Sequence, residues 1–274
     1  MKKILGAIAA LAMTVGLAAC GTPVSQGTAN QNQLVVGMEA GYPPFNWTQK
    51  DDSNGAVKIQ GTDQYAGGYD VEIAKRVAKQ LGKELVIVKT EWDGLTPALV
   101  SGKIDAIIAG MSPTEERKAT IDFTDSYYDS QLVLVVKKGS KYANATSLAD
   151  FAGAKVTAQL NTFHYSVIDQ ITGVDKQAAM DNFPAMRVAL QAGTIDAYVS
   201  ELPEAISAQA ANSDFVMVKL TDGFKTSPED TQTAVGVKKD STLTKQINEA
   251  LKTISSEERQ QIMQEAIKNQ PAAE

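Results

Sequence analysis

The sequence predicts an α/β protein built from two similar lobes. The segment Ala98-Leu-Val-Ser-Gly-Lys-Ile-Asp-Ala106 recurs 91 residues later as Ala189-Leu-Gln-Ala-Gly-Thr-Ile-Asp-Ala197. Each copy has the pattern of a helix that ends at a glycine and leads into a strand. Because ligands of open α/β sheets bind beyond the carboxyl ends of strands, we expect a site where the two units meet.

The chain begins with the pattern of a signal peptide at residues 1–19. Two lysines precede an apolar run, 4–19, that is short for a membrane-spanning helix. The run ends in Leu17-Ala-Ala-Cys20, which resembles the bacterial lipoprotein box, in which the cysteine is lipidated and becomes the mature N-terminus. The alternative is an ordinary secretory peptide with an incidental cysteine.

Composition narrows the possible partners. Residues 20–33 carry no charge and few apolar side chains, so we expect a flexible tether. Without the signal peptide, 24 basic residues stand against 32 acidic ones, a net charge of −8. The sequence has no cluster of lysines and arginines that would indicate nucleic-acid binding. The acidic balance opposes binding to anionic lipid headgroups, so we expect membrane contact through the N-terminal lipid alone. We expect a monomer, and one cysteine excludes an internal disulfide.

Apolar patterning predicts strands and helices in alternation. The loop after the first strand carries Glu39 and Tyr42, and its two prolines exclude a helix. Trp92 follows another strand. Strands are expected at 33–38, 85–88, 104–109 and 155–159, and helices at 69–81, 243–254 and 262–267.

A group of hydrogen-bond donors follows the predicted strand 104–109. The strand ends at Gly110, where the backbone can approach a ligand closely, and Ser112 comes next. Thr114 predicts the cap of a helix that carries Arg117. A hydroxyl, strand-end amides and a guanidinium can converge there, and such a group suits a carboxylate. The alternative is a surface arginine paired with a nearby acid.

The second repeat leads into the opposite charge. The first copy runs into Ser112 and Arg117, whereas the second runs into Ser200 and Glu201. A zwitterion held between the lobes would use both charges.

Two extended runs predict where the chain crosses between the lobes. Residues 131–136 and 231–237 are expected to pair and form a two-strand hinge. Lobe 1 then comprises residues 34–131 and 231–270, and residues 132–230 form an inserted lobe 2. In lobe 2, Asn161-Thr162 is a polar turn that opens a helix. His164, the only histidine, is expected on that helix's surface, with no metal site.

Nearly the whole mature chain resembles the extracytoplasmic polar amino-acid-binding proteins of ABC importers. The most specific part is Ala109-Gly-Met-Ser-Pro-Thr-Glu-Glu-Arg-Lys118, followed by Ile121-Asp-Phe-Thr-Asp-Ser-Tyr-Tyr128. The resemblance implies the type II periplasmic-binding-protein fold, with two Rossmann-like lobes, and no cofactor. It also implies a ligand-binding lipoprotein that delivers its ligand to separate permease and ATPase subunits.

The resemblance assigns roles to several residues. The segment with Gly110, Ser112 and Arg117 would supply the carboxylate site. Tyr42 and Trp92 would form two walls around the ligand. The position of Glu201 usually holds an aspartate on the ligand's ammonium, and that of Asn161, beside Thr162, usually holds a glycine.

The identity of the ligand stays open. Glu39 matches a position that is acidic in some binders of basic amino acids, which favours lysine, arginine or ornithine. Alternatively, Glu39 is solvated or satisfied by a neighbour, and the ligand is glutamine or another neutral polar amino acid. Some proteins of this fold are dehydratases acting on small acids, but the chain lacks recognisable nucleophile, phosphate-loop and dinucleotide motifs, so we expect no enzyme.

Overall fold

The structure is a computed structural model that describes residues 32–271. The predicted signal peptide, Cys20 and nearly all of the tether lie outside the described residues. Within the described part of the chain, no helix is long and apolar enough to cross a membrane.

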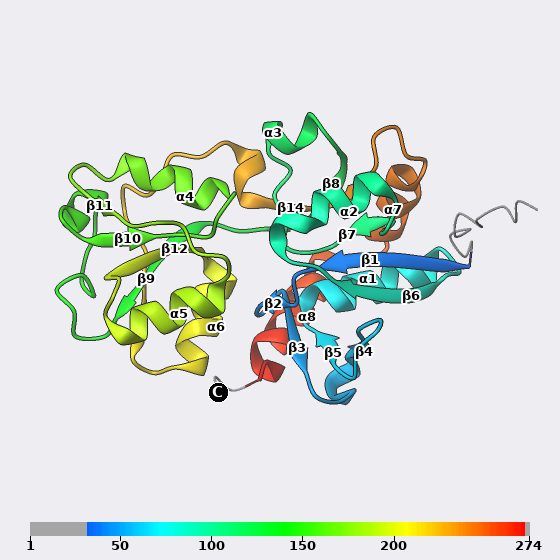
Figure 1. Ribbon diagram of the computed structural model, residues 1–274, viewed down its shortest axis with the longest axis horizontal. Coiled ribbons are helices and arrows are strands. Elements are labelled where there is room, and N and C mark those ends of the chain that lie inside the picture. Colours follow the sequence, from blue (N-terminus) through cyan, green and yellow to red (C-terminus); the bar gives the residue numbers. More distant parts are fainter. Residues whose placement is uncertain (1–31, 272–274) are drawn as a thin grey trace, which may run out of the picture. The chain divides into compact units, whose positions relative to one another are not determined.

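The chain forms two α/β lobes, each built around a five-stranded sheet (Figure 1). In the first sheet the strand order is β6-β1-β7-β14-β8. β1 runs parallel to β6 and β7, whereas β14 runs antiparallel to its neighbours β7 and β8. The strands are β1 (Gln33–Met38), β6 (Glu84–Lys89), β7 (Ala106–Ile107), β8 (Asp122–Asp129) and β14 (Gln232–Val237).

Helices and a smaller sheet complete the first lobe. The small sheet has the order β2-β3-β5-β4 and is inserted between β1 and the first helix. Its strands are β2 (Gly41–Tyr42), β3 (Asn46–Gln49), β4 (Val57–Lys58) and β5 (Tyr65–Gly67). The helices are α1 (Tyr69–Gln80), α2 (Leu95–Ser101), α3 (Glu115–Lys118), α7 (Leu243–Lys252) and α8 (Ser256–Asn269).

The second sheet has the order β11-β10-β12-β9-β13. β10 is parallel to β11 and β12, and β9 is antiparallel to β12 and β13. The strands are β9 (Leu132–Lys137), β10 (Lys155–Thr157), β11 (Asp175–Lys176), β12 (Ala197–Glu201) and β13 (Phe215–Val218). The helices are α4 (Phe163–Val167), α5 (Phe183–Ala192) and α6 (Leu202–Ala211).

The sequence repeat corresponds to a repeated helix-to-strand unit, as predicted. α2 ends at Gly102 with φ +81°, and α5 ends at Gly193 with φ +75°, both in the left-handed region that glycine tolerates. The chain then enters β7 in the first sheet and β12 in the second. The residues that follow these two strands therefore start from corresponding places in the two lobes.

The predicted pairing of the two hinge runs is wrong. β14 pairs with β7 and β8, whereas β9 pairs with β12 and β13 in the other sheet. The reason is that the chain leaves the first sheet at Ser130, whose N–H donates to the carbonyl oxygen of Thr231 at 2.8 Å. The carbonyl of Gln131 already accepts from the N–H of Leu202 at 3.0 Å. The exact lobe boundaries stay a prediction.

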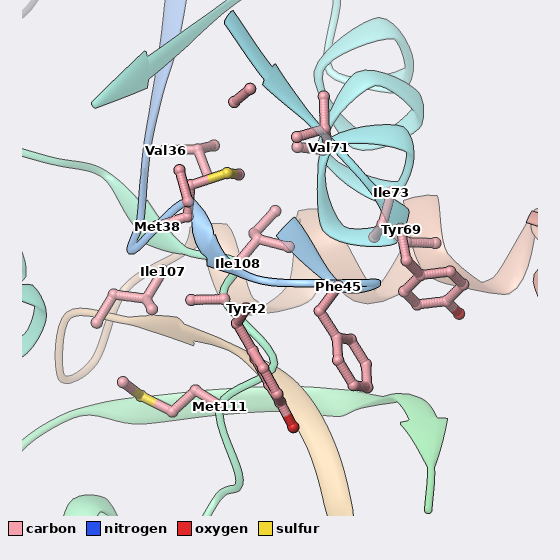
Figure 2. Packing of buried hydrophobic residues seen from close by; sticks show 14 of the residues in the cluster. Val36, Met38, Tyr42, Phe45, Tyr69, Val71, Ile73, Ile107, Ile108 and Met111 are labelled. Atoms are coloured by element: carbon pink, nitrogen blue, oxygen red, sulfur yellow. The ribbon is translucent and has the colours of Figure 1, made fainter. Parts of the chain in front are cut away.

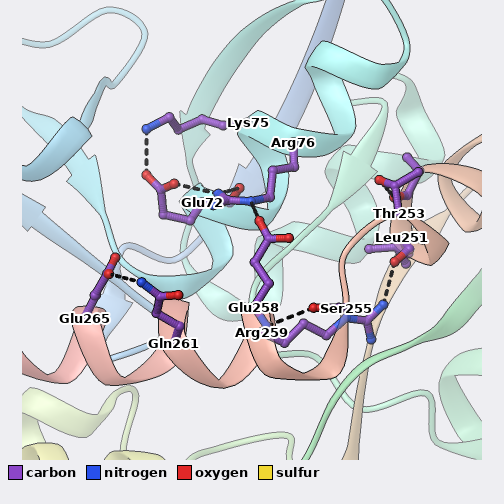
Figure 3. A network of polar contacts seen from close by, with 11 residues as sticks. Glu72, Lys75, Arg76, Leu251, Thr253, Ser255, Glu258, Arg259, Gln261 and Glu265 are labelled. Carbon is purple, nitrogen blue, oxygen red and sulfur yellow. Dashed lines mark hydrogen bonds and ion pairs between the residues drawn. The ribbon is translucent and has the colours of Figure 1, made fainter.

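α8 is tied to both lobes. The guanidinium of Arg76 on α1 contacts Glu72 at 2.7 Å and Glu258 on α8 at 2.7 Å (Figure 3). Beyond the end of α8, the side-chain amide of Gln270 donates to the carbonyl oxygen of Ser207 on α6 at 3.2 Å. The C-terminal helix therefore links the lobes in addition to the two crossings of the chain.

The core of the first lobe positions the loop that follows β1. Val36 and Met38 of β1 are fully buried, and Figure 2 shows them near Ile108 and facing α1. The loop then places Tyr42 and Phe45 side by side at the edge of this core (Figure 2). Packing of the apolar strand thus sets where the aromatic side chains of the site lie.

Candidate functional site

Arg117 lies against three groups from both lobes. Thr114 caps α3 as predicted, since its hydroxyl accepts from the N–H of Arg117 at 3.4 Å. The guanidinium carbon lies 5.0 Å from the centroid of the Trp92 ring. Nη1 donates to the carbonyl oxygen of Ser112 at 3.0 Å, and Nη2 donates to that of Asn161, in the other lobe, at 3.2 Å.

Among residues 32–271, no carboxylate forms an ion pair with Arg117. Burial lowers the pKa of Arg117 to about 10, while Glu116, Asp230 and Glu201 act in the opposite direction. The group stays charged at neutral pH, yet its hydrogen bonds go to uncharged carbonyls. A carboxylate brought to this point would gain a charge-assisted, bidentate partner.

Ser112 and Gly110 use their polar groups within the protein. The Ser112 hydroxyl donates to the carbonyl oxygen of Asp230 at 2.8 Å, so it does not point its hydrogen at a shared point with Arg117. Gly110 has φ +64°, and a Cβ there would lie 2.7 Å from Cε1 of Tyr42. The close approach predicted at Gly110 is thus made by the Tyr42 ring, and no larger residue fits.

A buried hydrogen-bond network fixes the backbone at Gly110. The N–H of Gly110 donates to the Tyr127 hydroxyl at 3.1 Å, and that hydroxyl donates to Asp70 Oδ1 at 2.7 Å. Asn46 Nδ2 donates to the other oxygen of Asp70 at 2.7 Å. Burial raises the pKa of Asp70 to about 7, against the opposing effect of these hydrogen bonds. Sequence reasoning missed this network, since its members lie on three separate elements.

Tyr42 is stacked between two phenylalanines. Its ring lies 4.9 Å from that of Phe45 and 4.5 Å from that of Phe183, which belongs to α5 in the second lobe. The Tyr42 hydroxyl is buried and has no hydrogen-bond partner among residues 32–271. Burial, followed by the nearby charge of Glu201, holds its pKa well above the usual value of 10. Phe183 was not anticipated from the sequence.

His164 is buried, so the prediction of a helix-surface histidine is wrong. Only 5% of the residue is exposed, and its Nε2 lies 3.3 Å from Oε1 of Glu201, which is 1% exposed. α4 is a short helix that starts directly after the Asn161-Thr162 turn, and its first turn faces inward. The rings of Phe163 and Phe183 lie 4.3 Å and 6.4 Å from that of His164.

Glu39 is buried and bound to a neighbour from the other lobe. Gln159 Nε2 lies 3.2 Å and 3.4 Å from its two carboxylate oxygens and also donates to the carbonyl oxygen of Asp181 at 3.0 Å. Burial raises the pKa of Glu39 to about 7, partly offset by the bond from Gln159. In the structure, the Glu39 carboxylate is therefore satisfied by a neighbour, the side-chain amide of Gln159.

Asn161 joins the lobes through both its side chain and its carbonyl. Its φ of +54° lies in the left-handed region that asparagine tolerates. Its Nδ2 donates to Asp93 Oδ1 at 2.9 Å, while its carbonyl oxygen accepts from Arg117 and, at 3.5 Å, from Trp92 Nε1. The neighbouring Thr162 hydroxyl donates to the carbonyl oxygen of Gln159 at 2.7 Å.

Six of the nine predicted ligand-binding residues line a very small cavity, whereas Glu39, Asn161 and Glu201 do not line it. Its volume is about 10 Å³, which is room for no more than one water molecule. A larger cavity of about 430 Å³ has Glu39, Lys89, Glu91 and Arg187 in its walls. The small cavity is lined by Tyr42, Trp92, Gly110, Ser112, Arg117, Gln159, Thr162, Phe163, His164 and Phe183.

The fold and this interlobe cleft define a two-lobed binding protein. Residues 34–269 match the family described as bacterial extracellular solute-binding proteins, family 3, and the chain belongs to this family. The resemblance noted from the sequence and the predicted fold are thereby confirmed. The family consists of binding proteins and not of enzymes, which also confirms that expectation and removes the dehydratase alternative.

Three relatives illustrate the range of the family. The arginine-binding extracellular protein ArtP of Bacillus subtilis (strain 168) is 30% identical over 254 residues, 92% of each chain. The ABC transporter glutamine-binding protein GlnH of the same strain is 31% identical over 291 residues, 99% of this chain and 100% of its own. The crystal structure of the amino acid ABC transporter substrate-binding protein AbpA from Streptococcus pneumoniae Canada MDR_19A, bound to L-arginine, has a TM-score of 0.74 and 27% identity, covering 87% of this chain and 95% of its own.

Proposed function

We propose that the protein binds one free amino acid between its lobes and presents it to the permease of an ABC importer. The observation that carries the proposal is the guanidinium of Arg117, half-buried over Trp92, whose hydrogen-bond partners among residues 32–271 are carbonyl oxygens. A ligand carboxylate would replace the Asn161 carbonyl at Nη2. The ligand's ammonium would bind Glu201, whose Oε2 is buried without a partner in the described part of the chain. The similarity to ArtP, GlnH and AbpA, whose names describe binding of arginine, glutamine and an amino acid, supports an amino acid as the ligand.

Binding then requires the lobes to open and close. An amino acid cannot enter a cavity of about 10 Å³ while Tyr42 is stacked on Phe183. Opening would break the contacts of Asn161 with Arg117 and Asp93 and that of Gln159 with Glu39. A ligand that bridges both lobes restores such contacts in the closed state and therefore shifts the equilibrium toward it.

Within this function, we favour a cationic side chain on the ligand. Glu39 is a desolvated carboxylate, and within the described part of the chain its side-chain hydrogen-bond donor is the neutral amide of Gln159. A lysine, arginine or ornithine side chain would replace that amide with a charged donor. Glutamine is the alternative, because the Gln159 bond already satisfies Glu39.

A thermal-shift screen of the soluble domain against all twenty amino acids and ornithine tests the function. A ligand at 100 times its Kd adds about 2.7 kcal/mol to the free energy of unfolding. We expect stabilisation by lysine, arginine or ornithine. Stabilisation by glutamine alone would overturn the cationic preference, and no response to any amino acid would overturn the function.

We further propose that the mature protein is held at the outer face or periplasmic side of the cell membrane by a lipid on Cys20. The support is the Leu17-Ala-Ala-Cys20 motif, followed by a tether without charge. The permease and ATPase would be separate subunits.

A further inference from the structure

We infer that His164 is a positioning residue that fixes the carboxylate of Glu201 so that its second oxygen is available to the ligand's ammonium. The inference rests on the proposed function and deepens it. It starts from two neighbouring buried groups, His164 and Glu201, joined by a contact of 3.3 Å. Each of them also has one buried polar atom, Nδ1 and Oε2, without a hydrogen-bond partner among residues 32–271.

The first step concerns Glu201. It is the last residue of β12 and is 1% exposed, so water does not solvate its carboxylate. Its side chain has three rotatable bonds, and in the described part of lobe 2 His164 is the one residue whose side chain forms a hydrogen bond with its carboxylate. The Tyr42 hydroxyl, which also interacts with this carboxylate, belongs to lobe 1. Without the imidazole, no other side chain of lobe 2 among the described residues has a hydrogen bond that would select one orientation of the carboxylate while the lobes are open. A buried carboxylate with one open oxygen is costly unless a donor arrives, and a bound ammonium supplies that donor.

The second step concerns the state of the imidazole. An ionised carboxylate only accepts hydrogen bonds, so the contact with Oε1 places a proton on Nε2 of His164. The ring cannot turn freely, since Phe163 and Phe183 lie 4.3 Å and 6.4 Å from it. His164 therefore holds one oxygen of Glu201 in a fixed place and leaves the other open.

The third step links the pair to the cleft. His164 lines the same small cavity as Arg117 and Tyr42, which come from the other lobe. Glu201 also raises the pKa of the Tyr42 hydroxyl, which shows that its charge acts on that wall of the cavity. Glu201 and Arg117 also act on each other, since Glu201 is among the charges that oppose the lowered pKa of Arg117, and a zwitterion carries the charges that complement both.

The test compares two substitutions with two kinds of ligand. His164→Leu removes the donor to Glu201, whereas His164→Gln retains an amide donor of similar reach. Calorimetry would measure binding of L-arginine and of 5-guanidinopentanoic acid, the same molecule without its α-ammonium. L-Glutamine and 5-amino-5-oxopentanoic acid form the equivalent pair if the wild type selects a neutral ligand.

We expect His164→Leu to weaken the amino acid by about tenfold or more and the ammonium-free analogue by less than about threefold, since a bond to a charged group is involved. His164→Gln should recover most of the loss. Equal losses for both ligands, no loss in His164→Leu, or no recovery in His164→Gln would overturn the inference. If His164→Leu fails to fold, His164→Phe provides the same comparison with a flat ring.

Failure of the proposed function gives a different result. A wild-type protein that responds to no amino acid in the thermal-shift screen would overturn that function, and this inference with it. If the wild type binds the amino acid, but His164→Leu weakens the amino acid and its ammonium-free analogue equally, the positioning role alone is overturned.

Discussion

Glu39 makes the closed form of the protein sensitive to pH. Burial raises its pKa from the ordinary 4.5 to about 7, so the folded closed protein binds a proton more tightly than the unfolded chain does. The stability that this proton contributes is fully present below pH 4.5 and is lost as the pH rises through 7. A shift of this size corresponds to roughly 3 kcal/mol between the two limits.

Glu39→Gln should remove that loss, because an amide oxygen can still accept the bond from Gln159. In urea unfolding of the ligand-free soluble domain, we expect equal stability of variant and wild type near pH 4. At pH 8 the variant should be more stable by about 1 to 3 kcal/mol, the lower figure applying if the lobes open and hydrate Glu39 before the chain unfolds.

The matched control is Glu91→Gln, which removes the same charge from an exposed neighbour. It should reduce the pH dependence only slightly, because an exposed carboxylate loses little hydration on folding and because burial raises the pKa of Glu39 more than the charge of Glu91 does. Asp70 titrates in the same range in every variant and therefore cancels in the difference. If wild type and Glu39→Gln lose stability in parallel between pH 4 and pH 8, burial does not raise the pKa of Glu39, and the predicted pH dependence is refuted.

Three further predictions address the supports of the site and the anchor. Tyr127→Phe leaves the N–H of Gly110 and one oxygen of Asp70 without their partner, so urea unfolding should show a loss of about 2 kcal/mol; a loss below 0.5 kcal/mol would contradict the network. Gly110→Ala places a Cβ against Tyr42 at a left-handed φ and should lower stability by about 1 to 3 kcal/mol, whereas Gly61→Ala, also left-handed but with open space, should lose only the smaller backbone contribution. Cys20→Ala should move the protein from the membrane fraction to a soluble fraction in fractionated cells, and retention in the membrane would refute the lipid anchor.

The parts of the fold that follow from local patterns could be predicted from the sequence. The helix that begins at Tyr69, the strand that begins at Gln33 and the glycine ends of α2 and α5 match their periodicity and caps. The predicted strand 104–109 is shorter in the structure, where only Ala106–Ile107 forms β7. Sheet pairing depends on where the chain turns, so the partner of β14 could not be found from two extended runs alone.

The sequence predicted which charged residues belong to the candidate site, but not which side chains contact them. Arg117, Trp92 and Tyr42 are brought to one cavity, and Glu201 is the last residue of β12, the strand that the second repeat enters. His164 was misplaced because a five-residue helix shows no amphipathic period that would orient it. Phe183 and Gln159 reach the site from lobe 2, and only tertiary packing places them against Tyr42 and Glu39.

The central claim is that the guanidinium of Arg117 binds the ligand's carboxylate. Calorimetry of Arg117→Ala with the amino acid that most stabilises the wild type tests it directly, with Lys118→Ala on the same helix as the control. We expect the affinity of Arg117→Ala to fall at least about 100-fold, since about 3 kcal/mol is typical of a charge-assisted pair in a partly desolvated site. Thermal unfolding of the ligand-free variant and the affinity of Lys118→Ala should change little. An affinity of Arg117→Ala within about threefold of the wild type would contradict the account.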